Sequence, residues 1–338
     1  MTGIGYRPFL IAALALALVA SMIVAVALGA VPVPLKTVVG VVVAQVAPGA
    51  IERAWPLGEE RIVWDIRVPR AILAALVGAG LAVVGATLQA ITRNPLADPY
   101  LFGVSSGAAL GAVAVIVHLG LFLGPATLPL AAFVGAMSAL LMVLAIAGGR
   151  RPGPERLVLA GVAVSFVFAA ATNFLIFAGD PRAAHSVVFW MLGGLGLARW
   201  SLLAVPAAVA IPGILILVLH GRVLNALASG DETAASLGVE VASVRLRLFT
   251  ISAVVTGALV AVSGAIGFVG LIIPHLVRAG IGADNRRVLP VAALAGALFI
   301  VWADVAARLL LAPQELPIGM ITAALGGGFF IWHMARRP

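Results

Sequence analysis

The sequence predicts an all-α, polytopic membrane protein with ten transmembrane helices, some of them short or broken. Of its 338 residues, 63% are hydrophobic and 10% are charged, whereas soluble domains carry about 25% charged residues. Apolar runs long enough to cross about 30 Å of hydrocarbon recur along the chain. The 38 glycines suit close helix packing in lipid. No stretch is left for a sizeable soluble domain, so residues 1–338 are expected to form a single transmembrane domain.

The first apolar run, Phe9–Ala30, follows Arg7 and ends in small residues, as a signal peptide does. Its 22 residues exceed the apolar region of about 7–15 residues that is typical of such peptides. A retained first helix is therefore the favoured interpretation. A long polar loop, 31–70, is expected to follow it.

The remaining spans are expected at Ala71–Ile91, Leu101–Leu121, Leu128–Ala147, Leu157–Ala178, Ser201–His220, Leu248–Ser263, Gly264–Arg278, Val288–Leu311 and Leu316–Met334. Proline and glycine mark the breaks between several of them, with a tight basic loop at 148–156. The run Gly264–Arg278 is rich in glycine and too short for an ordinary span, so it predicts a short or broken helix. The aromatic, amphipathic segment 179–200 is expected to lie at an interface rather than to span.

Ten spans place both termini on one side of the membrane. With cytoplasmic termini, the inner loops hold 13 of the 21 Lys and Arg residues and the outer loops hold 8, which follows the positive-inside rule. This bias also accounts for the net charge of +8 without nucleic acid as a partner. We therefore expect a multi-pass membrane protein with both termini cytoplasmic.

The sequence lacks the motifs of several chemistries. It has no cysteine and only one lysine, Lys36, so it contains neither thiolate sites nor a phosphate-binding P-loop. Its histidines are far apart in sequence. We predict no catalytic residue, no metal site and no permanently bound cofactor. An ion-coupled secondary transporter would place ionisable groups near mid-membrane, where this chain carries mostly Ala, Val, Leu, Ile and Gly, so energy is expected to come from another protein.

The segment 228–240, ASGDETAASLGVE, is a polar island between apolar runs. Adjacent acids at Asp231 and Glu232 precede Gly238, which suits a short helix with a glycine terminator. Such a compact helix can dock in a cleft of a partner. The alternative interpretation is a solvated loop helix.

Several motifs then occur in order: RVPR (67–70), GAGLAVVGATLQAITRNPLADPYLFGVSSGA (78–108), GAIGFVGLIIPHLVR (264–278), ADVAARL (303–309) and ELPIGMITAALGG (315–327). Together they resemble the permease subunits of the ABC importers for cobalamin, haem and ferric siderophores, the FecCD type, over about Val31–Trp332. One departure is Gly326–Gly328 before Phe329, where many members have Gly-Ala-Pro. This triple glycine is expected to loosen the start of the last half-turn.

The resemblance implies a permease rather than an enzyme. It implies a homodimer or pseudo-dimer around a central pathway in the bacterial inner (cytoplasmic) membrane. It also implies two copies of a cytoplasmic ATPase that uses ATP and Mg, and a periplasmic substrate-binding protein. It also implies that a coupling helix inserts into a cleft on the ATPase. The matching residues here are Gly230, Asp231, Glu232, Thr233, Ala234, Ala235, Ser236, Leu237 and Gly238.

By the same resemblance, Arg67, Arg70 and Arg308 receive carboxylates from the lobes of the binding protein. Arginine suits this task because its planar fork is always charged and pairs with carboxylates bidentately. Asp304, one turn before Arg308 on the same helix face, is expected to hold that arginine in place. The alternative is that the arginines reach lipid headgroups.

Two further sets of residues concern the pathway. Asn94, Pro95 and Asp98 are expected to form its inner lip, with a purely structural turn as the alternative. Arg182 and His185 are candidates for substrate contact, because haem carries two propionates and an iron that histidine ligates. The alternative is a solvated interfacial helix. We therefore predict import of haem or another iron chelate, with cobalamin or a ferric siderophore as the alternative substrate.

Overall fold

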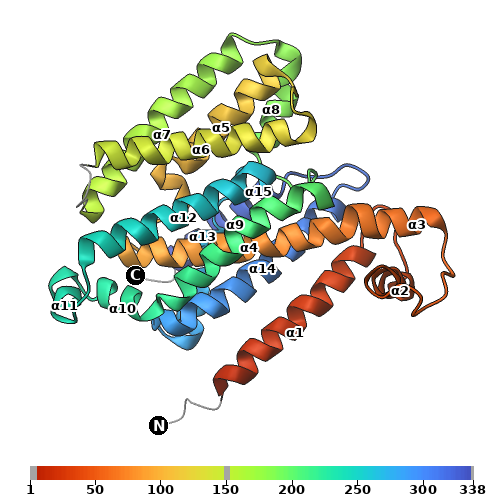
Figure 1. Ribbon diagram of the computed structural model, residues 1–338, viewed down its shortest axis with the longest axis horizontal. Helices are drawn as coiled ribbons and strands as arrows, with labels where there is room; N and C mark the ends of the chain where they lie inside the picture. The colour runs from red at the N-terminus through yellow and green to blue at the C-terminus, as the bar shows by residue number, and fades with distance from the viewer. Residues whose placement is uncertain (1–5, 148–152, 336–338) are drawn as a thin grey trace.

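The computed structural model describes residues 6–147 and 153–335, and the architecture there is all-helical (Figure 1). Within these described residues, eight helices are long and apolar enough to cross a membrane, when each helix is taken together with the turns that extend it. Their α-helical cores are α1 (Tyr6–Ala27), α4 (Val68–Thr92), α6 (Thr127–Ile146), α7 (Pro154–Phe177), α9 (Trp200–Leu219), α12 (Val241–Ser263), α14 (Asn285–Leu309) and α15 (Ile318–Ala335).

Two shorter apolar helices occupy the positions of the third and eighth predicted spans. They are α5 (Val104–Ala114), which η3 (Val115–Leu119) extends, and α13 (Val269–Ile281). At about 1.5 Å per residue, the 13 residues of α13 cover about 20 Å, less than the thickness of the hydrocarbon core. The predicted fold of ten helices, some of them short, is confirmed.

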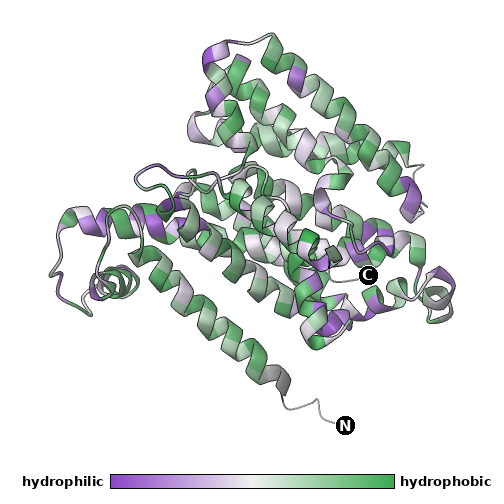
Figure 2. Cartoon of the chain, turned by 180° about the vertical axis from the view of Figure 1, so that it is seen from behind, coloured by the Kyte–Doolittle hydropathy of each residue, from purple (hydrophilic) through white to green (hydrophobic). Residues whose placement is uncertain are grey.

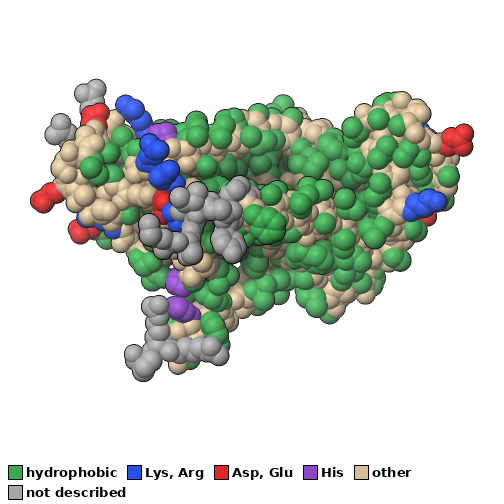
Figure 3. Space-filling view, turned by 90° about the horizontal axis from the view of Figure 1, so that it is seen from below, with side chains coloured by type: hydrophobic (Ala, Val, Ile, Leu, Met, Phe, Trp, Pro, Cys, Tyr) green, Lys and Arg blue, Asp and Glu red, His purple; other side chains and the backbone are tan. Residues whose placement is uncertain are grey.

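The bundle has two polar ends. The short helix α3 (Leu57–Arg61) lies at one end, and α11 (Asp231–Ser236) lies at the other (Figure 1). We call these the α3 end and the α11 end. Hydrophilic residues gather at both ends in Figure 2, and apolar side chains cover the middle of the face seen in Figure 3. This distribution is the one that a membrane-spanning bundle requires, with its long axis across the bilayer.

Helices α4 and α14 form the centre of the bundle and pack against each other at glycines. A Cβ added at Gly78 would lie 2.1 Å from the carbonyl oxygen of Gly296, and one at Gly296 would lie 2.3 Å from that of Gly78. Neighbouring side chains such as Val77 and Leu81 are almost completely buried. Small residues let helix backbones approach closely in lipid, where packing drives association.

The prediction that residues 31–70 form a polar loop is wrong in part. It contains α2 (Leu35–Val46), and an unbroken helical stretch runs from Leu57 through α3, the π-helical turn η1 (Ile62–Arg67) and α4 to Thr92. The predicted start at Ala71 marked only where the apolar run begins. The helix continues outward because its polar residues have partners there: Glu60 accepts hydrogen bonds from Gln45 Nε2 (2.9 Å) and Trp55 Nε1 (3.0 Å).

Other boundaries also differ from the expectations. Helix α12 begins at Val241 rather than Leu248, since its first turns are polar. The segment 179–200 contains a 3₁₀ turn, η5 (Pro181–Ala183), and an eight-residue helix, α8 (Ala184–Met191), which is too short to span. Helix α15 continues through Gly326–Gly328 to Ala335, so the expected loosening there is wrong. The basic loop at 148–156 lies mostly outside the described residues.

Candidate functional site

The predicted coupling segment forms a short helix between two glycines with positive φ. Helix α11 covers Asp231–Ser236, with φ of +116° at Gly230 before it and +81° at Gly238 after it. A positive φ is cheap only for glycine, so these residues set sharp turns at both ends. The segment thus projects from the α11 end as a compact knob (Figure 1).

One face of this knob packs inward and the other is exposed. Ala234 is completely buried, whereas Glu232, Ala235 and Leu237 are exposed. Leu237 is a large apolar residue that is 68% exposed. An exposed apolar residue on a knob that also carries an exposed acid gives a second protein both shape and charge to recognise.

A buried arginine fixes the knob to the transmembrane helices. Arg245 on α12 is 3% exposed; its Nη2 donates to Asp231 Oδ1 (2.6 Å), and its Nε donates to the carbonyl oxygen of Ile91 near the end of α4 (3.2 Å). Arg93 lies 3.6 Å from the same carboxylate. The hydrogen bond from Arg245 lowers the pKa of Asp231, so the ion pair persists at neutral pH. Through Arg245, α11 is thus joined to both α4 and α12.

The three residues predicted to form an inner lip do not lie together at one surface. Asn94 and Pro95 are accessible, while Asp98 is buried. Asn94 Oδ1 accepts from the backbone N–H of Leu96 (2.9 Å), and Asp98 Oδ1 accepts from that of Tyr100 (2.9 Å). Both side chains cap local turns, and Asp98 is the N-cap of the 3₁₀ helix η2 (Pro99–Phe102). This favours a structural role for Asp98 over a role in the pathway.

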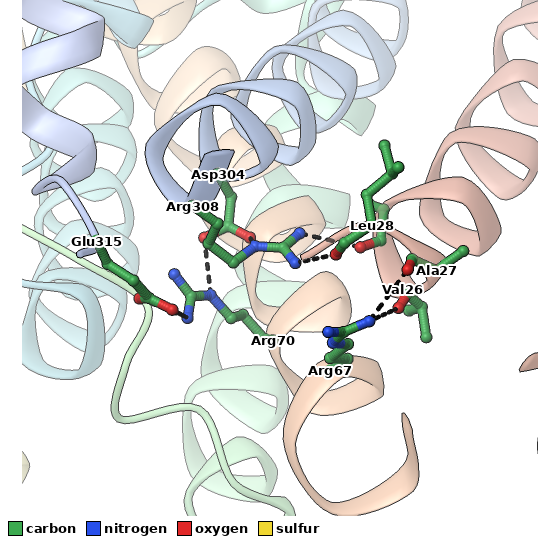
Figure 4. Close-up of polar contacts among 9 residues, drawn as sticks. Val26, Ala27, Leu28, Arg67, Arg70, Asp304, Arg308 and Glu315 are labelled. Atoms are coloured by element: carbon green, nitrogen blue, oxygen red, sulfur yellow. Dashed lines mark hydrogen bonds and ion pairs between the residues drawn. The ribbon is translucent and has the colours of Figure 1, made fainter. Parts of the chain in front are cut away.

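At the α3 end, the three predicted docking arginines belong to one polar cluster (Figure 4). Asp304 Oδ1 accepts from Arg70 Nε (2.8 Å), and Asp304 Oδ2 accepts from Arg308 Nε (2.9 Å). Arg70 also pairs with Glu315 (2.9 Å). The expectation that Asp304 holds Arg308 is confirmed, and the same carboxylate holds Arg70 as well. Sequence reasoning missed Glu315 as a partner.

Two of these arginines bind the carboxyl end of α1. Arg67 Nη1 donates to the carbonyl oxygens of Val26 (2.9 Å) and Ala27 (3.1 Å), and Arg308 Nη2 donates to that of Ala25 (3.0 Å). The last carbonyls of a helix have no partner within it and carry partial negative charge, so guanidinium groups are suitable caps. Arg67, Arg70 and Arg308 are each less than 10% exposed. In this structure all three arginines therefore have partners within the chain, and their predicted docking to a binding protein stays a prediction.

We expect Arg308→Ala to loosen the end of α1, because it removes the hydrogen bonds to Ala25 and Leu28. A charged hydrogen bond contributes about 1.5–3 kcal/mol, so the loss in stability should be about 2 kcal/mol. Hydrogen exchange of purified protein in micelles should show faster exchange in the last turn of α1. Arg199→Ala, which changes an exposed arginine, is the control. Unchanged exchange in α1 would contradict the capping role.

Beside this cluster lies a cavity of about 420 Å³. Its walls come from α8, the segment 193–197, the end of α12 and the segment 315–318, and they include Arg70, His185 and Glu315. The ring of His185 packs 4.5 Å from that of Phe189, which also lines the cavity. Arg182 is not part of the lining. Of the two predicted substrate residues, the structure places only His185 at the cavity. The guanidinium of Arg70 also lines it, paired with Asp304 and Glu315.

Comparisons with known proteins agree on one family. The model of the FecCD transport family matches residues 16–336. The chain is 42% identical to the hemin transport system permease of Yersinia pestis over 81% of this chain and 84% of that protein. It is 40% identical to the vitamin B12 import system permease of Vibrio cholerae, over 84% and 85% of the two chains. It is also 40% identical to the Fe(3+)-citrate import system permease of Bacillus subtilis, over 82% of each.

A solved structure gives the same result for the fold. The structure, described as a metal-chelate type ABC transporter in an inward-facing conformation, superposes with a TM-score of 0.82 at 30% identity. The match covers 96% of this chain and 97% of that one. The agreement extends over nearly the whole chain in both sequence and fold. The chain belongs to the FecCD transport family and is a multi-pass permease subunit of an ABC importer.

Proposed function

We propose that this permease moves haem, or another iron chelate, from the periplasm to the cytoplasm across the bacterial inner membrane. The observation that carries the proposal is the cavity at the α3 end, where His185, Arg70 and Glu315 line one space with Phe189. An imidazole suits iron, a guanidinium suits a propionate, and an aromatic ring suits a flat macrocycle. The 42% identity to a hemin permease supports this choice. Ferric citrate, a ferric siderophore or cobalamin is the alternative within the same family.

The proposed orientation places the α11 end and both termini in the cytoplasm. This follows from the excess of basic residues in the loops assigned to that side. Two copies of an ATPase would bind there and receive the knob, residues 230–238, in a cleft, while a second copy of this chain would complete the pathway. The exposed residues Glu232, Ala235 and Leu237 would make that contact. ATP and Mg would be used by the partner.

Docking of a periplasmic binding protein at the α3 end also remains a proposal. The buried state of Arg67 and Arg308 adds a condition to it, because each would have to exchange carbonyls of α1 for carboxylates of the partner. Arg70 would likewise have to leave Asp304 or Glu315. Docking through these residues thus requires α1 to move, whereas docking through the exposed carboxylate of Glu315, which is 50% exposed, does not.

The substrate proposal is tested by titrating the purified chain in lipid nanodiscs with hemin, ferric citrate and cobalamin. Hemin is expected to bind with a shift in its visible spectrum, and His185→Ala is expected to weaken binding at least about tenfold through loss of an iron ligand. His118→Ala, at an exposed histidine outside the cavity lining, is the control. Equal or tighter binding of cobalamin or ferric citrate would replace haem as the substrate.

A further inference from the structure

The structure brings together two histidines that are 58 positions apart in the sequence. His275 lies within α13, and His333 lies in the last turn of α15. Their ring centroids are 4.7 Å apart, with an angle of 80° between the ring planes. Both side chains are partly buried. Helix α15 starts at the α3 end, where the N–H of Leu316 bonds to the carbonyl of Ala307 (2.9 Å), so its last turn lies toward the α11 end.

The ring separation suits one metal ion shared by both imidazoles. With metal–nitrogen bonds of about 2.0–2.1 Å, each ring centre lies about 3.2 Å from the ion. If one nitrogen of each ring points to the ion, a separation of 4.7 Å between centroids corresponds to an angle at the metal of about 95°, near the values of octahedral and tetrahedral sites. Two axial ligands of a haem lie on opposite faces of the macrocycle, about 6 Å apart by the same bond lengths. The pair therefore fits a bare metal ion rather than haem.

Aromatic rings hold the two histidines in place. Phe329 stacks on His333, with centroids 5.8 Å apart and 15° between the planes, and meets His275 edge to face at 5.7 Å. Phe330 lies 6.5 Å from His275. Packing of this kind restricts ring rotation, and an apolar shell around a metal site limits access of water. Ligands that are already placed lose less freedom when the ion binds.

We propose that His275 and His333 form a binding site for a divalent first-row metal ion of the type that imidazole prefers, such as Zn²⁺, Cu²⁺ or Ni²⁺. In the described residues no group of three or more His, Cys, Asp or Glu side chains gathers to hold a metal, so water or a small ligand would fill the remaining positions. The ion would bridge α13 to α15. Within one chain, helix α15 has 17% of its most apolar window buried, so such a bridge would add to the few contacts that hold it against α13.

The test is direct metal binding by the full chain, purified in micelles without a polyhistidine tag and treated with a chelator. Calorimetric titration with Zn²⁺ should give one ion per chain. His333→Phe, which keeps an aromatic ring for Phe329 but removes the ligand, should weaken binding at least about tenfold, as loss of even an outer-shell partner costs a metal site about 10–100-fold. His275→Asn should have a similar effect, and the double variant should add little, since either loss destroys the chelate.

Two controls make the result decisive. His118→Gln changes an exposed histidine elsewhere and should bind Zn²⁺ as the wild type does. Zn²⁺ should also raise the melting temperature of the wild type but not that of His333→Phe, because an ion stabilises the state that binds it. Absence of Zn²⁺ binding by the wild type, or equal affinity of His333→Phe, would overturn the proposal. Neither readout requires a transport partner, so the outcome is independent of the proposed substrate.

Discussion

Gly78→Leu is expected to lower the free energy of unfolding by about 3 kcal/mol, the upper part of the range for overpacking a core. The new Cβ would lie 2.1 Å from the carbonyl oxygen of Gly296, and a backbone atom cannot rotate away as a side chain can. This steric clash can be relieved only if α4 and α14 separate at the centre of the bundle. The measurement is thermal unfolding of the purified protein in micelles, followed by circular dichroism.

Gly327→Leu on α15 is the matched control for this prediction. It also changes a helical glycine to leucine, but a Cβ there meets no atom within 4 Å. The change should be neutral or slightly stabilising, because leucine favours helix more than glycine does. Equal melting temperatures for both variants would show that the close approach of α4 and α14 does not limit stability.

Arg245→Ala is expected to separate ATP hydrolysis from transport. The side chain joins Asp231 in the knob to the carbonyl of Ile91 on α4. If the knob docks on the ATPase as proposed, loss of Arg245 leaves that contact in place but weakens the attachment of the knob to the bundle. In proteoliposomes that contain the ATPase, the number of substrates moved per ATP should fall about tenfold, equivalent to about 1.4 kcal/mol of lost coupling. A variant that merely lost stability would lower both rates together.

Arg247→Ala is the control, because this arginine lies on the same helix but is exposed. Asp231→Asn removes the other partner's charge while keeping its shape, so it should reproduce part of the effect of Arg245→Ala. If Arg245→Ala transported substrate with an unchanged ratio to ATP, force transfer through this ion pair would be excluded.

The positions of the helices could be predicted from the sequence because the bilayer imposes a length on apolar runs. The same reasoning misplaced the starts of the helices that contain Ala71 and Leu248, since hydropathy measures the part of a helix in lipid rather than the helix itself. The stretch Leu57–Arg67 is helical although it is polar. Its stability comes from partners such as Gln45 and Trp55, which no local pattern reveals.

Residues of the candidate sites could be predicted from the sequence only where they belong to a recognisable motif. The knob at 230–238 and the pair Asp304 and Arg308 follow from local spacing, and both were found. The partners of Arg67 are backbone carbonyls of α1, and every residue has a carbonyl, so the sequence contains no signal for this contact. The proximity of His275 and His333 likewise depends on how α13 and α15 pack. These contacts required three-dimensional information.

The anchoring of α1 has a consequence for how the protein is made. The bond from Arg308 to the carbonyl of Leu28 joins residues 280 positions apart. Synthesis proceeds from the N-terminus at about 5–20 residues per second, so α1 is produced well before α14 leaves the ribosome. During that interval the carbonyls at the end of α1 have only water, lipid headgroups or Arg67 as partners. The ninth of the ten predicted spans thus completes the attachment of the first, so the end of α1 gains its full set of partners only late in synthesis.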